Sequence, residues 1–311
     1  MGYSKLWRLI RILAVFLLLF GLSACTRGKK TEPRAKTNLP PVITSVTIQP
    51  QEPNIKSELN LFIQSQDPDG DPVTYQYQWL RNDEEIIGEK QNTLKKGNFK
   101  KGDLIRVRVT PSDGKVNGTP FLSAPVKVLN SSPVIQEVWI EPKVAYVTDR
   151  LKANVKSSDL DGDFIYYTYQ WEKNGGVLNE ERGEFLERGR FKKGDSIAVI
   201  VTADDREVQS PPKRSETLII LNSPPIILSS PPTSAEKSTY IYPVIANDPD
   251  NDPLTFTLKS GPKGMEMDKK TGLIRWEIRK EDRGNHSVEI EVSDDAGAKS
   301  IQRYTLTIDF R

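Results

Sequence analysis

The chain has 311 residues, which is enough for two or more domains at about 150 residues each. Hydrophobic residues make up 36% of the sequence and charged residues 28%, so we expect a packed core and not global disorder. Lysine and arginine total 44 against 42 aspartates and glutamates, and this balance argues against a nucleic-acid-binding protein. A single cysteine and a single histidine exclude a disulfide framework, a cysteine-based zinc site and a multi-histidine metal site.

The first 24 residues have the pattern of an export signal. Three basic residues, Lys5, Arg8 and Arg11, precede an uncharged and mostly apolar run from Ile12 to Ala24. This run is too short to cross a bilayer comfortably as a helix, for which about 20 residues are needed. We therefore predict a secretory signal peptide over 1–24 rather than an uncleaved membrane anchor.

The end of this segment, Leu22-Ser23-Ala24-Cys25, resembles the lipobox of bacterial lipoproteins. The resemblance implies that Cys25 becomes the first mature residue and carries the acyl chains that anchor the protein in a membrane. Thr26 follows Cys25, and no Asp occupies that position. In Gram-negative lipoproteins this arrangement resembles the pattern of those that reach the outer membrane. In a Gram-positive cell the same anchor would lie in the plasma membrane. The basic segment 25–37 has no apolar periodicity and is predicted to be a flexible lipidated tether.

The rest of the chain contains internal repeats. Four motifs recur after 92 residues without a gap, which indicates duplication of a whole domain. A third unit opens with a similar segment, Asn222 to Ile227, and then diverges. The predicted domains are 38–130, 131–222 and 223–311. The motifs of the first copy are Pro41-Val42-Ile43, Asp69-Gly70-Asp71, Tyr77-Gln78-Trp79 and Phe99-Lys100-Lys101-Gly102-Asp103.

Within each unit the apolar residues alternate with a period of two. Ile105, Val107 and Val109 share one face of a predicted strand, and matching strands occur in the other two units. Clusters of Pro, Gly, Asn and Asp separate the strands, and no stretch beyond residue 38 shows a capped helical period. We therefore predict an all-β fold of three tandem antiparallel β-sandwich domains.

Two families are similar to these units. The first two resemble bacterial extracellular immunoglobulin-like or fibronectin-like repeats, on a D-x-D-G-D turn, a Y-x-W strand and a K-G-D turn. The third resembles the cadherin-like, dystroglycan-type immunoglobulin module, on Asp248–Asp252, Thr271–Ile274, Trp276 and Ser293–Asp295. The resemblances imply an immunoglobulin-like fold, and cadherin-like modules use ions to stiffen the joints between domains.

Each unit also carries an Asp-x-Asp-x-Asp turn and a second acidic position after a later strand. If the two segments are the B–C and F–G loops of a sandwich, they share one end of it and their carboxylates converge. Calcium takes six to eight hard oxygen ligands, so each end is a candidate calcium site. The candidate ligands are Asp67, Asp69, Asp71 and Asp113; Asp159, Asp161, Asp163 and Asp205; and Asp248, Asp250, Asp252, Asp294 and Asp295.

Plain turn chemistry is the alternative for these residues, because Asp caps β-turns by accepting hydrogen bonds from its own backbone. The third unit is the favoured calcium site, since both of its acidic segments match the family pattern. Two further motifs also have two interpretations. Trp79 and Trp171 are either core residues, which we favour, or stacking platforms for sugars. Lys101 and Lys193 are expected to be solvated turn residues.

No nucleophile elbow, zinc-protease motif or phosphate-binding loop is present, so no enzyme is expected, although a carboxylate-only glycosidase stays open. We expect a lipid-anchored protein of the bacterial cell envelope, on the outer membrane, that acts as a calcium-stiffened spacer or adhesion module. The alternative is an accessory lipoprotein that binds polysaccharide or cell wall. The expected partners are a membrane and an unidentified protein or glycan, and not nucleic acid.

Overall fold

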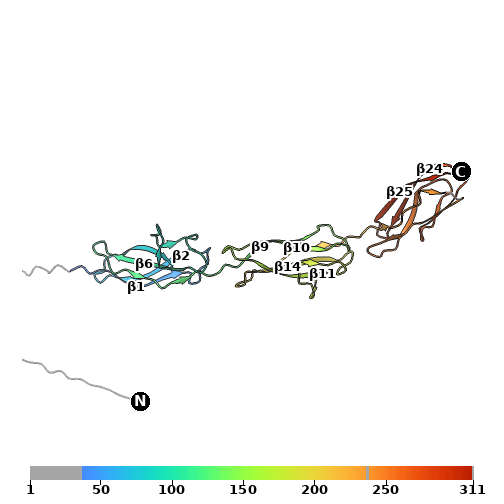
Figure 1. Ribbon diagram of the computed structural model, residues 1–311. Helices are drawn as coiled ribbons and strands as arrows, with labels where there is room; N and C mark the ends of the chain where they lie inside the picture. Colours follow the sequence, from blue (N-terminus) through green and yellow to red (C-terminus); the bar gives the residue numbers. More distant parts are fainter. Residues whose placement is uncertain (1–36, 236–237, 310–311) are drawn as a thin grey trace, which may run out of the picture.

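The computed structural model describes residues 37–235 and 238–309, which form three β-sandwich units arranged end to end (Figure 1). Each unit has its own hydrophobic core, so the predicted all-β fold of tandem antiparallel sandwiches is confirmed. The predicted signal peptide and Cys25 lie outside the described residues. Among the residues that are described, no helix is both long and apolar enough to cross a membrane.

The first unit has two antiparallel sheets that face each other across its core. Its strands are β1 (Val42–Gln49), β2 (Leu59–Gln66), β3 (Thr74–Arg81), β4 (Glu84–Glu85), β5 (Thr93–Leu94), β6 (Leu104–Ser112), β7 (Phe121–Leu122) and β8 (Val126–Lys127). One sheet has the order β1-β2-β5, and the other has β4-β3-β6 with β7 and β8 both paired to β6. Ile105, Val107 and Val109 of β6 are fully buried, as their alternation predicts.

The second unit repeats this arrangement strand for strand. Its strands are β9 (Val134–Glu141), β10 (Leu151–Ser158), β11 (Tyr166–Lys173), β12 (Gly176–Val177), β13 (Phe185–Leu186), β14 (Ser196–Asp204), β15 (Lys213–Arg214) and β16 (Leu218–Ile219). The sheets are β13-β10-β9 and β12-β11-β14, with β15 and β16 paired to β14. A common structure therefore follows from the common motifs of the two units.

The third unit keeps the sandwich but changes the strand pattern. Its elements are β17 (Ile226–Ile227), β18 (Ser234–Ala235), β19 (Thr239–Pro243), β20 (Ala246–Asn247), β21 (Thr255–Ser260), β22 (Glu266–Met267), β23 (Leu273–Glu277), the 3-10 turn η1 (Lys280–Asp282), β24 (Gly284–Ser293) and β25 (Lys299–Ile308). The sheets are β18-β25-β24-β21 and β19-β23-β22, with β17 paired to β20. In this unit β18 pairs in parallel with β25, at the edge of the larger sheet.

Each core contains one fully buried tryptophan, so the preferred interpretation of Trp79 and Trp171 as core residues is confirmed. Both side chains have an exposed fraction of 0%, and Trp276 has 1%. The indole N–H of Trp79 donates to the carbonyl of Gln91 and that of Trp171 to the carbonyl of Gly183, each at 2.9 Å. A buried indole with a satisfied N–H is a packing residue and not a platform for a sugar ring.

Replacing either core tryptophan should therefore destabilise its own unit strongly. We expect Trp79→Ala or Trp171→Ala to lower the free energy of unfolding by about 3–5 kcal/mol, the usual cost of removing a large buried side chain. Urea unfolding followed by circular dichroism measures the effect. Trp139, which is only half-buried on β9, is the matched control, and Trp139→Ala should cost clearly less. Equal effects at all three positions would contradict this account of the core.

Candidate functional site

The acidic segments of each unit lie on two loops at the same end of the sandwich. The Asp triplets follow β2, β10 and β20, and the second acidic positions come at the ends of β6, β14 and β24. Because β3 pairs antiparallel with β6, β11 with β14 and β21 with β24, the two loops meet beside the start of each unit. In the second and third units this end also meets the preceding unit, through a lysine described below.

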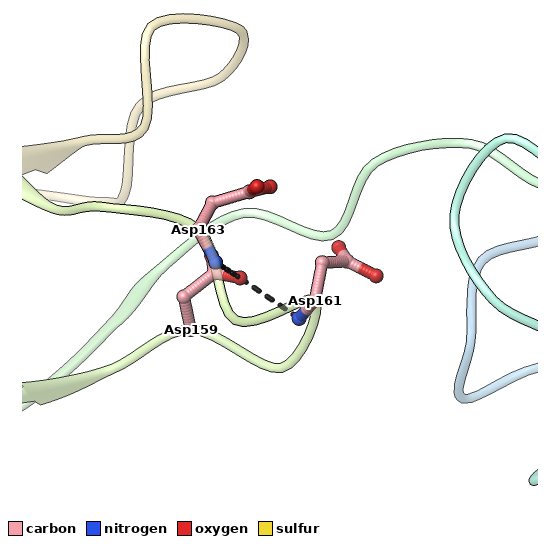
Figure 2. Close-up of side chains that lie close together, drawn as sticks. All are labelled: Asp159, Asp161 and Asp163. Atoms are coloured by element: carbon pink, nitrogen blue, oxygen red, sulfur yellow. Dashed lines mark hydrogen bonds between the residues drawn. The ribbon is translucent and has the colours of Figure 1, made fainter.

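The first Asp of each triplet folds its turn. Asp159 Oδ1 accepts the backbone N–H groups of Asp161 and Asp163 at 2.8 and 3.3 Å (Figure 2). Asp67 and Asp248 make the same pair of bonds in their own units. Gly162 at the centre of the turn has φ = 82°, a conformation that glycine adopts without strain. One oxygen of each of these carboxylates therefore caps its own turn, which is the alternative to calcium binding that the sequence also allows.

The second Asp of each triplet holds the linker that enters the unit. Its Oδ2 accepts the backbone N–H of the residue that follows the linker asparagine. The pairs are Asp69 with Leu39 at 2.8 Å, Asp161 with Ser131 at 2.6 Å and Asp250 with Ser223 at 2.5 Å. The chain between two units is thereby fixed to the acidic end of the second of them.

The asparagine in front of this residue binds the other acidic loop. Its side-chain N–H donates to the Asp after the later strand; the pairs are Asn38 with Asp113 at 2.6 Å, Asn130 with Asp205 at 2.7 Å and Asn222 with Asp294 at 2.7 Å. Sequence reasoning assigned these asparagines no role. Their recurrence at intervals of 92 residues, at the boundary where each unit begins, was the available signal.

The hydrogen bonds at this loop hold its carboxylates in the charged form. The backbone N–H of Val116 and the side chain of Asn38 lower the pKa of Asp113 to about 2. Burial raises the pKa of Asp294, but the hydrogen bonds from Asn222 and the backbone of Ala298 outweigh it and lower the pKa below its usual value. Asp248 has a raised pKa, because burial outweighs its two backbone hydrogen bonds.

The third Asp of each triplet contacts a lysine ammonium. Lys101 Nζ lies 2.6 Å from Asp163 Oδ2 and 2.6 Å from Glu207 Oε1, and Lys193 Nζ contacts Asp252. Hydrogen bonds to Asp163 and then to Glu207 raise the pKa of Lys101 above its usual range. Both lysines reach across from the preceding unit. The expectation that they are solvated turn residues is wrong, because their partners belong to a neighbouring domain.

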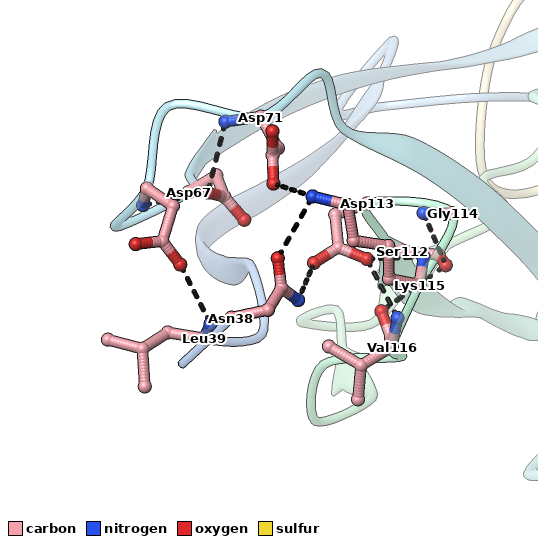
Figure 3. A network of polar contacts seen from close by, with 10 residues as sticks. Asn38, Leu39, Asp67, Asp71, Ser112, Asp113, Gly114, Lys115 and Val116 are labelled. Carbon is pink, nitrogen blue, oxygen red and sulfur yellow. Dashed lines mark hydrogen bonds and ion pairs between the residues drawn. The ribbon is translucent and has the colours of Figure 1, made fainter. Parts of the chain in front are cut away.

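The first unit supplies this lysine from its own loop. Lys115 Nζ lies 2.7 Å from Asp71 Oδ2 and donates to Asn38 Oδ1 at 3.2 Å (Figure 3). The same picture shows Asn38 reaching Asp113, so the network closes within one unit.

Several buried oxygens at these ends have no hydrogen-bond partner, and they test whether the residues fit a hard cation. Asp248 is only 3% exposed, yet its Oδ2 has no partner. Buried oxygens without donors call for an ion or water, and carboxylate and hydroxyl oxygens suit calcium. The unpartnered oxygens are Asp67 Oδ2 in the first unit; Asn130 Oδ1, Ser131 Oγ, Asp159 Oδ2 and Asp161 Oδ1 in the second; and Ser223 Oγ, Asp248 Oδ2 and Asp250 Oδ1 in the third.

The predicted ligands gather unequally. Asp159, Asp161 and Asp163 each offer an oxygen within 4.8 Å of the others, and so do Asp248, Asp252 and Asp294. Within the described residues the first unit contributes no such group. The side chain of Asp295 is 60% exposed and lies 3.9 Å from Lys193 Nζ, outside this group. Within the described residues, three carboxylates therefore lie this close together only at the two ends that meet a preceding unit.

A family model described as "Putative Ig domain" matches residues 224–309, which is the third unit. No curated protein matches the chain. Similar solved structures include Sidekick-1 immunoglobulin domains 1–5, with 14% identity over 89% of this chain and 60% of that chain and a TM-score of 0.32. The N-terminal eight Ig domains of Down Syndrome Cell Adhesion Molecule have 14% identity over 88% of this chain and 37% of that chain, with a TM-score of 0.39. Protocadherin Gamma B2 extracellular cadherin domains 3–6 have 10% identity over 88% of this chain and 78% of that chain, with a TM-score of 0.27.

The chain thus spans 60% of the length of the Sidekick-1 structure. The fold defines a tandem β-sandwich protein, and the family match adds that its third unit is similar to an immunoglobulin-like domain.

The linker asparagines should contribute in proportion to the burial of their partners. Asn222→Ala leaves Asp294, which is 6% exposed, without its side-chain donor, and we expect a loss of about 1–3 kcal/mol in the stability of the third unit. Asn38→Ala should cost less in the first unit, because Asp113 is only half-buried. Chemical denaturation of both variants makes the comparison, and a larger loss for Asn38→Ala would refute it.

Proposed function

We propose that this chain is a lipid-anchored protein of the cell envelope that acts as a non-catalytic spacer and interaction module. The observation that carries the proposal is the construction of the joints. Each unit binds the incoming linker through two carboxylates, and a third carboxylate contacts a lysine of the preceding unit at both joints. Such joints hold the units end to end and project the third unit away from the anchor. Cys25 supplies that anchor, by the lipobox resemblance, and the outer membrane is the proposed location.

The proposal includes calcium at the two joints. Asp159, Asp161 and Asp163 would hold an ion at the first joint, and Asp248, Asp252 and Asp294 at the second. The support is the set of buried oxygens without partners, which is larger at these two ends than at the first unit. A bound divalent ion would neutralise crowded carboxylates and so oppose their mutual repulsion. Asp67, Asp69, Asp71 and Asp113 of the first unit are not part of the proposed calcium sites.

The other carboxylates of the joints have structural partners. Asp205 accepts hydrogen bonds from Asn130 and from the backbone of Val208, and Asp250 accepts one from Ser223. These groups fix the linker and its loop, which is a positioning role. The family match of the third unit supports an interaction role by analogy alone, since one sandwich fold serves many functions.

Polysaccharide binding is the second candidate, and one observation favours it. Of the four tryptophans in the described part of the chain, Trp139 alone is not fully buried. It lines a groove beside β9 together with three basic residues, Lys143, Lys213 and Arg214, and two acidic residues, Glu137 and Glu216. An aromatic ring with cationic neighbours suits an acidic sugar. Retention of the chain on an acidic polysaccharide, and loss of retention in Trp139→Ala, would support this role.

Calcium should stabilise the soluble chain 38–311 against heat. A ligand that binds only the folded state contributes about 4 kcal/mol at a thousandfold excess over its Kd, so millimolar calcium should raise the melting temperature relative to excess EDTA. Asp248→Asn and Asp294→Asn keep the shape of the side chain but remove its charge, and each should abolish most of the shift in the transition of the third unit. Differential scanning calorimetry with and without calcium makes the measurement.

The matched control is Asp268→Asn. Asp268 also caps a turn of the third unit, by accepting the N–H groups of Lys270 and Thr271, but it lies between β22 and β23 and outside the joint. This variant should keep the whole calcium shift. If the unmodified chain melts at the same temperature in calcium and in EDTA, the carboxylates serve turns and ion pairs alone.

Lipid anchoring has its own test. Cys25→Ser removes the thiol that would carry acyl chains, so the protein should move from the membrane fraction to the soluble fraction of the cell. Fractionation followed by mass spectrometry of the N-terminal peptide makes the comparison. Ser23→Cys is the control, because it keeps Cys25 and should leave the protein in the membrane fraction. Membrane association that persists unchanged in Cys25→Ser would rule out this anchor.

A further inference from the structure

The third carboxylate of every triplet receives an ammonium group, but the lysine comes from two different places. Asp163 and Asp252 receive Lys101 and Lys193 from the unit before them. Asp71 receives Lys115 from the F–G loop of its own unit. A carboxylate at this place is therefore neutralised in all three units, either across a joint or from within.

The internal repeat shows how the source is selected. Lys115 of the first unit and Glu207 of the second stand 92 residues apart and are equivalent positions of the duplicated domain. In the first unit the lysine pairs with Asp71, whereas in the second unit Glu207 pairs with the incoming Lys101. The charge at this position therefore selects the source of the lysine. Glu207 in the second unit pairs with a lysine of the preceding unit, whereas Lys115 in the first unit is itself the lysine that pairs with Asp71.

The turn that delivers the lysine is fixed to the chain that leaves the unit. Gly102 N–H donates to the carbonyl of Val128 at 2.8 Å, and Val128 N–H donates to the carbonyl of Asp103 at 2.8 Å. The second unit repeats both bonds between its own turn and Ile220. Gly102 has φ = 87°, so the turn needs glycine there. The lysine is therefore delivered from a braced turn beside the linker.

We propose that Lys101 and Lys193 are the resident cations of the two joints, and that each holds the next unit in place without a metal ion. A divalent ion at the same carboxylates has to compete with the lysine for Asp163 or Asp252. The competition rests on the proposed calcium sites, whereas the role of the lysines in holding the joints does not.

The metal-free function is tested by Lys193→Met, which keeps the length of the side chain and removes its charge. Spin labels are placed by Lys156→Cys on β10 and Glu277→Cys on β23, both exposed positions, in a soluble chain that lacks Cys25 and so has no other cysteine. In EDTA we expect a clearly broader distance distribution between the labels for Lys193→Met than for the unmodified joint. Unfolding of the individual units, followed by circular dichroism, should be unchanged.

Lys192→Met is the matched control. Lys192 lies next to Lys193 in the same turn, is exposed and makes no ion pair within the described part of the chain. Its variant should keep the narrow distribution. An equally narrow distribution for Lys193→Met in EDTA would overturn the proposal that lysine holds the joint.

A second variant tests the selection of the lysine. Glu207→Lys gives the second unit the arrangement of the first, so the new ammonium should pair with Asp163 and displace Lys101. We expect the first joint to become mobile while both neighbouring units stay folded, and Glu207→Gln should have a smaller effect. An undisturbed joint in Glu207→Lys would contradict the assigned role of this position.

Competition is measured by calcium titration of the unmodified chain and Lys193→Met. Removing a positive charge next to a divalent ion should lower the Kd for calcium at the second joint by about tenfold. This is the order of magnitude of the Coulomb repulsion expected in water between an ammonium group and a divalent ion about 4 Å apart. An unchanged Kd would overturn the competition. If neither chain binds calcium, the proposed calcium sites fail, and the label distances in EDTA still decide whether lysine holds the joint.

Discussion

The structure between the units depends on one electrostatic constraint, the crowding of carboxylates at one end of each sandwich. Three of them offer oxygens within 4.8 Å of one another at each joint, and like charges so close need compensation. The chain provides it with backbone N–H groups for the first and second Asp of each triplet, with a lysine for the third, and with the linker asparagine for the Asp of the other loop. The linker is ordered as a consequence, because its own N–H and asparagine side chain are among the donors.

This constraint separates two kinds of stabilisation in the molecule. Each unit is held by its own apolar core around a buried tryptophan, and the three core clusters do not share residues. The joints, in contrast, consist of hydrogen bonds and ion pairs, which weaken when a charge is removed or screened by salt. The lysine of the preceding unit is the part of a joint that lies outside the core of the next unit, so its removal can change the orientation of that unit and leave its core intact.

The sequence predicts the parts of this structure that depend on local patterns. The alternation of Ile105, Val107 and Val109 identifies a half-buried strand, and the recurrence of Trp79 as Trp171 identifies equivalent cores. The partner of Lys101 was not predictable in the same way, because Asp163 lies 62 residues further on and in another domain. Whether two such groups meet depends on the orientation of whole units, which no local pattern encodes.

The contacts at the joints also have a direction that the duplication explains. A unit with an acidic start and a Lys-Lys-Gly-Asp turn at its far end is complementary to a copy of itself placed head to tail, so duplicating it produces a joint at once. The first two units carry both features, and Lys193 meets an acidic end in the third unit that diverges in most of its other motifs. The third unit carries no Lys-Lys-Gly-Asp turn. The features shared by all three units are therefore the acidic loops and the asparagine that fix the incoming chain, whereas the Lys-Lys-Gly-Asp turn is shared only by the first two.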